Sequence, residues 1–140
     1  MDNALKTGQE EIVSSRQLQL RVEELGRQIT QDYQGRQLVL LGVLNGAFIF
    51  AADLCRAIAL DLEIDFIRVT SYGASTESSG TIRLLKEPSI DLRGKDVLLV
   101  EDIVDTGTTM AWLRDHFRQS PAKSVKICSL IDKQERRIVP

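Results

Sequence analysis

This 140-residue sequence is poor in the residues that mark specialised protein classes, with two cysteines, three prolines, one histidine and 5% aromatic residues. Cys55 and Cys128 are too few for a disulfide framework or a structural zinc site, and both stand among apolar residues. We therefore expect two reduced core thiols and a cytoplasmic protein. The amino end lacks the charged-then-apolar pattern of a secretion signal, and no apolar run is long enough to cross a membrane.

An excess of charge of one sign is also missing. The 18 Lys and Arg residues nearly balance the 20 Asp and Glu residues, and the net charge of -2 gives no electrostatic reason to expect nucleic acid as a partner. His116 stands apart from any Ser or Cys nucleophile, so we expect it at the surface or at the edge of the core. The length and the 43% hydrophobic content predict one globular domain with a substantial core.

The order of apolar patterns predicts an α/β fold with a central parallel sheet and helices on both of its faces. A continuous apolar run opens the segment at 97–101, which is typical of a strand buried on both faces, and the apolar-rich segments at 38–43 and 124–131 also predict buried strands. Alternation predicts a strand at 62–69, and a short strand is expected at 82–85. Helical spacing predicts a helix from Ser14 or Ser15 to the turn at 34–36, and further helices at 47–58 and about 107–119. Residues 1–13 are expected to form a polar arm and residues 14–140 the domain.

The strand–loop–helix unit at 97–109 holds the densest group of chemically useful residues. Its apolar strand leads into Glu101 and Asp102, then Asp105, and then a run of Thr and Gly that opens a helical pattern. Free N–H groups, hydroxyls and the positive end of a helix together form an anion site. Acids directly before a phosphate cradle indicate a phosphorylated sugar, although the acids would also serve simply to cap and solvate the strand.

Two other strand ends carry polar residues that belong to the same edge of a parallel sheet. These are Leu44-Asn45-Gly46 and Lys133, and we expect them to converge with residues 101–109 because the carboxyl ends of parallel strands meet at one edge. Taken alone, a glycine such as Gly46 is more often plain turn chemistry, and Lys133 a solvated lysine. The polar segment at 74–80 is either a disordered tip or a functional lid.

The segment from Val100 to Thr109, Val-Glu-Asp-Ile-Val-Asp-Thr-Gly-Thr-Thr, resembles the phosphoribosyl-pyrophosphate motif of the type I phosphoribosyltransferases. The segments at 42–47, 65–66, 71–73, 93–98 and 129–133 are similar to the bacterial branch of that family that acts on hypoxanthine and guanine. The resemblance spans about residues 12–137. It implies the type I phosphoribosyltransferase fold, Mg²⁺ as cofactor, phosphoribosyl pyrophosphate and a 6-oxopurine as substrates, and a homo-oligomer, either dimer or tetramer.

The resemblance also implies a role for each residue of the motifs. Glu101 and Asp102 would hold the ribose hydroxyls and help to place Mg²⁺, and Asp105 would accept a proton from purine N7 as general base. The implied substrate-binding residues are Leu44, Asn45 and Gly46 for pyrophosphate, Asp105, Thr106, Gly107, Thr108 and Thr109 for the 5′-phosphate, Ser71 and Tyr72 on a lid, Lys133 for the purine 6-oxo group, and Ile103.

The implied reaction moves ribose 5-phosphate from phosphoribosyl pyrophosphate to N9 of hypoxanthine or guanine, giving IMP or GMP and pyrophosphate in purine salvage. The sequence departs from the family in two places. Asn45 stands where many members have Lys, and the family continues past residue 140 with an aromatic that stacks on the purine and an aspartate for a second Mg²⁺. The alternatives are therefore a non-catalytic module that senses phosphoribosyl pyrophosphate or a nucleotide, and an inactive truncated form.

Overall fold

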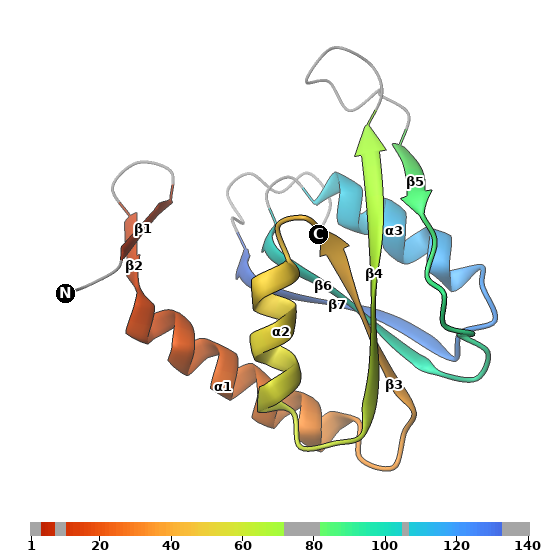
Figure 1. Cartoon of the computed structure of the whole chain (residues 1–140), viewed down its shortest axis with the longest axis horizontal. Helices are drawn as coiled ribbons and strands as arrows, with labels where there is room; N and C mark the ends of the chain where they lie inside the picture. Colours follow the sequence, from red (N-terminus) through yellow and green to blue (C-terminus); the bar gives the residue numbers. More distant parts are fainter. Residues whose placement is uncertain (1–3, 8–10, 72–81, 105–106, 133–140) are drawn as a thin grey trace.

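The structure, a computed structural model, describes residues 4–7, 11–71, 82–104 and 107–132. Strands and helices alternate along most of this part of the chain (Figure 1). The elements are β1 (Ala4–Thr7), β2 (Glu11–Ser14), α1 (Ser15–Asp32), β3 (Leu38–Leu44), α2 (Phe48–Ala57), β4 (Leu62–Ser71), β5 (Ile82–Lys86), β6 (Asp96–Val104), α3 (Thr108–Arg118) and β7 (Ser124–Asp132).

The core is a five-stranded sheet with the strand order β5-β4-β3-β6-β7. Strand β3 pairs in parallel with β4 and β6, and β6 pairs in parallel with β7, which confirms the predicted parallel sheet. Strand β5 is antiparallel to β4 at the edge of the sheet. Only residues 72–81 separate these two strands, fewer than the roughly dozen residues that a parallel crossover needs, so the second strand returns in the opposite direction.

Helices cover both faces of the sheet, as the sequence predicts (Figure 1). Helices α1 and α2 pack on the face that buries Leu40 and Leu98, whereas α3 packs on the face that buries Val39 and Leu99. Neighbouring side chains of a strand point to opposite faces, so both faces of β3 and β6 must be apolar. This explains why these strands read as continuous apolar runs.

Helix α1 begins with a capping box. The backbone N–H of Gln17 donates to Ser14 Oγ at 3.1 Å, and the backbone N–H of Ser14 donates to Gln17 Oε1 at 3.0 Å. Of the two predicted N-caps, Ser14 is therefore the one used. Reciprocal capping satisfies two donors at a helix start that would otherwise lack partners within the helix.

Helices α1 and α2 meet closely at Gly26. A Cβ atom added at this position would lie 2.5 Å from the carbonyl oxygen of Ala57, so only glycine allows the two backbones to approach this far. Thr30 closes the same contact, because its hydroxyl donates to the Gly26 carbonyl at 2.7 Å and accepts the N–H of Ala59 at 3.0 Å. The helix pair is thus fixed near the carboxyl end of α2.

Asp65 in β4 ties down the connection between β5 and β6. Its carboxylate accepts the backbone N–H groups of Phe66 at 2.7 Å, Ser89 at 2.6 Å and Ile90 at 3.3 Å, and lies 3.4 Å from Lys86 Nζ. Burial alone would raise the pKa of Asp65, but the N–H donors and the ammonium group outweigh it and hold the pKa below its usual value. The charged carboxylate is therefore part of the folded structure.

Strands β1 and β2 form a separate antiparallel hairpin within the region predicted as an arm. Ala4 pairs with Ser14 and Thr7 with Glu11, and the hairpin lies beside the start of α1, away from the five-stranded sheet (Figure 1). No strand is predicted here from the sequence. The division into an arm at 1–13 and a domain at 14–140 stays a prediction.

Candidate functional site

The strand ends singled out in the sequence lie side by side at one edge of the sheet. Strand β3 ends at Leu44, its neighbour β6 ends at Val104, and β7, the neighbour of β6, ends at Asp132. Val104 and Asp132 are paired in register. The predicted convergence of the 44–46 segment with the acids of β6 is therefore present in the structure.

Gly46 lies directly against the carboxylate of Asp102. A Cβ atom at Gly46 would stand 3.2 Å from Asp102 Oδ1 and 3.6 Å from Oδ2. The turn before α2 is closed by a hydrogen bond from Ala47 N–H to the Val43 carbonyl at 3.1 Å. Because Asn45 and Gly46 are exposed, their main chain is accessible to a ligand that also reaches Asp102.

Glu101 and Asp102 form a half-buried pair of carboxylates. The backbone N–H of Asp102 donates to Glu101 Oε1 at 3.0 Å, and the backbone N–H of Ile103 donates to Asp102 Oδ1 at 2.8 Å. Burial, followed by the interaction with the Asp102 side chain, raises the pKa of Glu101 to about 8. Without a cation, the pair thus retains a proton near neutral pH.

The chemistry of this pair fits a divalent cation. Carboxylate oxygens are the ligands that Mg²⁺ prefers, and a cation removes the repulsion that makes Glu101 hard to ionise. Among the described residues, no group of three or more His, Cys, Asp or Glu side chains is placed to hold a metal ion. A cation held by Glu101 and Asp102 would therefore take further oxygen ligands from a substrate or from water.

Helix α3 begins at the same edge of the sheet. Its N-cap, Gly107, has a φ of 87°, a left-handed conformation that glycine adopts without strain. Thr108 and Thr109 follow in the first turn of the helix and are half-buried. A helix N-terminus presents N–H groups and a positive dipole end, so this edge of the sheet offers an anion-binding position beside the two acids.

The structure describes only some of the remaining predicted site residues. Ile103 is 38% exposed near the end of β6. Ser71 is the last residue of β4. Tyr72, Asp105, Thr106 and Lys133 lie outside the described residues.

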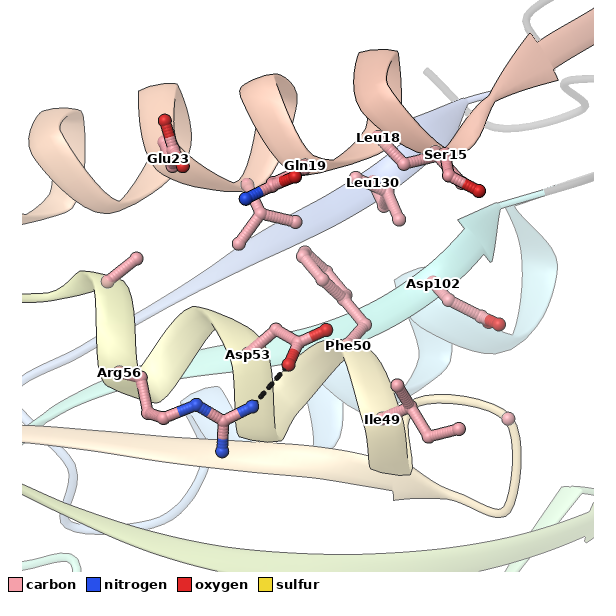
Figure 2. A pocket seen from close by; sticks show the side chains of 13 residues that line it. Ser15, Leu18, Gln19, Glu23, Ile49, Phe50, Asp53, Arg56, Asp102 and Leu130 are labelled. Atoms are coloured by element: carbon pink, nitrogen blue, oxygen red, sulfur yellow. Dashed lines mark hydrogen bonds and ion pairs between the residues drawn. The ribbon is translucent and has the colours of Figure 1, made fainter. Parts of the chain in front are cut away.

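A groove between α1 and α2, which the sequence analysis does not predict, leads to the candidate site. It has a volume of about 730 Å³, and its lining includes Gly46 and Asp102. Asp102 lies toward the end of the groove opposite Arg56 (Figure 2). Leu18, Phe50 and Leu130 line its apolar part, and the Asp53–Arg56 ion pair lies on α2 beside it (Figure 2). The one sign of this groove in the sequence is that the 47–58 helix is apolar on most of its surface, which is more than it needs to bury one face.

An acidic pair, a glycine turn and a helix N-terminus at one edge of a parallel sheet have the chemistry that binding of a phosphorylated sugar requires. The family model described as the phosphoribosyl transferase domain matches residues 8–140. The chain therefore belongs to the phosphoribosyltransferase family.

Three individual proteins of the family are similar to this chain over most of its length. The chain is 42% identical over 132 residues to the hypoxanthine phosphoribosyltransferase of Escherichia coli K12, a match that covers 93% of this chain and 74% of that protein. It is 45% identical over 131 residues to the hypoxanthine-guanine phosphoribosyltransferase of Streptococcus thermophilus CNRZ 1066, covering 94% and 69%. A crystal structure of the Bacillus anthracis hypoxanthine-guanine phosphoribosyltransferase superposes with a TM-score of 0.86 at 44% identity, covering 99% of this chain and 78% of that one. The predicted family and fold are confirmed.

Proposed function

We propose that this chain transfers ribose 5-phosphate from phosphoribosyl pyrophosphate to N9 of hypoxanthine or guanine, as part of purine salvage. The observation that carries the proposal is the contact between Gly46 and Asp102, which puts a main-chain turn and a sugar-binding acid at one point. The relatives named as hypoxanthine or hypoxanthine-guanine phosphoribosyltransferases support the choice of purine. Nothing in the structure favours the alternative of a sensing module.

In this proposal the substrate lies along the carboxyl edge of the sheet. Glu101 and Asp102 bind the ribose hydroxyls, and the helix N-terminus at 107–109, with Asp105 and Thr106 before it, holds the 5′-phosphate. Leu44-Asn45-Gly46 offers main-chain N–H groups to pyrophosphate. Ile103 contributes to the substrate pocket, Ser71 and Tyr72 belong to a lid, and Lys133 donates to the 6-oxo group of the purine.

The reaction replaces one bond at the sugar by another. Purine N9 attacks C1′, and the bond from C1′ to pyrophosphate breaks with its electron pair on the leaving oxygen. The proton that the purine loses at N7 passes to Asp105. Main-chain N–H groups at 44–46 stabilise the negative charge that grows on pyrophosphate, because fixed donors stabilise developing charge with little reorganisation.

We propose Mg²⁺ as the cofactor, with Glu101 and Asp102 as its protein ligands. The ion supplies charge neutralisation for the leaving pyrophosphate. The carboxylate pair itself orients the ribose hydroxyls. The raised pKa of Glu101 supports this assignment, since the pair is poorly compensated in the absence of a cation.

The remaining proposals concern assembly and location. Phe48 is 56% exposed and Ile49 69% exposed on α2, which supports the expectation of a dimer or tetramer because exposed apolar side chains often mark interfaces.

In the described part of the chain, no helix has the length and apolar character needed to span a membrane. The free cysteines, Cys55 and Cys128, support a cytoplasmic location, where thiols stay reduced.

The test is an assay of the 140-residue chain with phosphoribosyl pyrophosphate and Mg²⁺, supplying hypoxanthine, guanine, xanthine or adenine in turn. We expect nucleotide formation with hypoxanthine or guanine. In parallel, calorimetry should detect Mg²⁺-dependent binding of phosphoribosyl pyrophosphate that Asp102→Asn weakens strongly, whereas Asp53→Asn, on α2, has little effect. Binding without turnover of any purine would favour the sensing module, and equal binding by wild type and Asp102→Asn would refute the site.

A second test concerns the proposed general base. Asp105→Asn should lower turnover by about 10²–10⁴-fold, the usual contribution of a positioned base, while phosphoribosyl pyrophosphate still binds. Near-normal turnover in this variant would remove Asp105 from the mechanism.

A further inference from the structure

The aromatic ring of Phe66 occupies the space that a side chain on Gly42 would need. The two residues are register partners on β4 and β3. A Cβ atom at Gly42 would lie 2.7 Å from Phe66 Cε1 and 2.8 Å from Cδ1, so the ring rests on the bare backbone of β3. A larger residue at position 42 would have to displace this ring.

The same ring also contacts the first residue of α2. The ring centroids of Phe66 and Phe48 are 5.9 Å apart, with the rings tilted by 46°. Gly42 lies two residues before the end of β3 and Phe48 is the first residue of α2, so the two residues flank the turn at 44–46. One side chain of β4 therefore packs against both ends of the turn that contains Gly46.

The ends of the turn are also held by the buried side chains of Val43 and Ala47. Backbone hydrogen bonds run from Ala47 N–H to the Val43 carbonyl at 3.1 Å and from Phe48 N–H to the Asn45 carbonyl at 3.3 Å. Asn45 and Gly46 are exposed, so no core packing surrounds the middle of the turn. The distance from Gly46 to Asp102 thus depends on where the two ends of the turn are anchored.

We propose that Phe66 is a positioning residue for the pyrophosphate-binding turn at 44–46, an inference that rests on the proposed function of that turn. Phe66 touches no substrate itself. Its ring fixes the ends of the turn, so that the main-chain N–H groups of the turn face the same point as the Asp102 carboxylate before the ligand arrives. Removing the ring leaves a gap over Gly42 into which β3 and the turn relax, and the N–H groups lose their alignment.

The experiment compares two ligands by calorimetry, Mg²⁺-pyrophosphate and ribose 5-phosphate, on the 140-residue chain. Phe66→Leu removes the ring, and Phe66→Tyr keeps it. Ile64→Ala is the matched control, because Ile64 lies two residues earlier on β4, packs against the same apolar cluster and pairs with Leu40, further from the turn. Urea unfolding verifies that each variant is folded at the temperature of the titration.

We expect Phe66→Leu to weaken pyrophosphate binding by about ten- to a hundredfold, the loss in affinity that corresponds to one misaligned hydrogen bond to a charged group. The affinity for ribose 5-phosphate should be unchanged, because the acids of β6 and the start of α3 are untouched. Phe66→Tyr and Ile64→Ala should both bind pyrophosphate like the wild type.

Four results would overturn the inference. Unchanged pyrophosphate affinity in Phe66→Leu would show that the turn needs no support from the ring. Equal losses in Phe66→Leu and Ile64→Ala, or equal losses for both ligands, would show a general effect of lower stability. Absence of pyrophosphate binding in the wild type would refute the proposed function of the turn, and this inference with it.

Discussion

Replacing Asp65 of β4 by Asn should destabilise the fold more than the same exchange of a carboxylate for an amide within the β5–β6 connection that Asp65 binds. The carboxylate accepts two N–H groups from that connection, Ser89 at 2.6 Å and Ile90 at 3.3 Å, and is only 16% exposed. Hydrogen bonds to charged groups contribute about 1.5–3 kcal/mol each, and the half-exposed partner Lys86 adds at most about 1 kcal/mol. Because asparagine keeps one acceptor oxygen, we expect the free energy of unfolding to fall by about 2–4 kcal/mol at pH 7.

The measurement is urea unfolding of wild type and variant, with Asp91→Asn as the control. Asp91 lies in the same connection, is exposed and accepts one N–H, from Arg93 at 3.0 Å. Its replacement should change the free energy of unfolding by less than about 1 kcal/mol. If Asp65→Asn cost no more than Asp91→Asn, the anchoring role given to Asp65 would be wrong.

The pH dependence gives the same prediction a second test. The pKa of Asp65 is lower in the folded than in the unfolded protein, where it is about 3.9. The stabilisation is therefore fully present above the unfolded-state pKa and is lost as the pH falls through the lower folded-state pKa. The difference between wild type and Asp65→Asn should stay constant from neutral pH to about pH 5 and shrink below about pH 4. A difference that did not change in acid would contradict an electrostatic origin.

Three further predictions follow from particular contacts. Gly46→Ala should weaken binding of Mg²⁺-pyrophosphate in calorimetry, because its Cβ atom would stand 3.2 Å from Asp102 Oδ1. An unchanged affinity would show that pyrophosphate binding does not depend on the close approach of the turn to the acids. Gly26→Ala should lower the free energy of unfolding by about 1–3 kcal/mol, as overpacking against Ala57 typically does, and a neutral result in urea unfolding would contradict the close helix contact. Because burial and Asp102 raise the pKa of Glu101 to about 8, binding of Mg²⁺-phosphoribosyl pyrophosphate at pH 7 should release a proton, measured from heats in buffers of different ionisation enthalpy. The release should disappear in Glu101→Gln.

The elements that are long and strongly periodic were predictable from the sequence. The apolar spacing in 107–119 marks Met110, Leu113 and Phe117, and these are the residues that α3 buries. The apolar segments at 38–43 and 97–101 give β3 and β6 to within a few residues, since a strand covered on both faces leaves little room for polar side chains. The apolar-rich segment at 124–131 gives β7, an edge strand that also carries the exposed Lys126. Parallel pairing of the strands alone predicts that the strand ends carrying the candidate site lie at one edge of the sheet.

What the sequence could not provide depends on contacts between distant residues. The sequence around Asp65 and Phe66 does not predict that Asp65 binds the backbone near residue 89 or that Phe66 fills the space over Gly42. The groove between α1 and α2 exists because of the way two helices pack, which no local pattern encodes. The β1–β2 hairpin is similar, because strands of four residues carry too few positions for alternation to be recognised.

The central position of β3 and β6 has a consequence for how long the candidate site survives when the protein opens. Each of these strands is paired on both sides, and helices cover both faces of the sheet, so their amide hydrogens should exchange with solvent only on global unfolding. Strand β5 and the β1–β2 hairpin, at the margins, should exchange earlier. The doubly paired part of these strands, Leu38–Gly42 and Asp96–Val100, is thus the last part of the molecule to be lost, and the periphery can open and close many times while it stays paired.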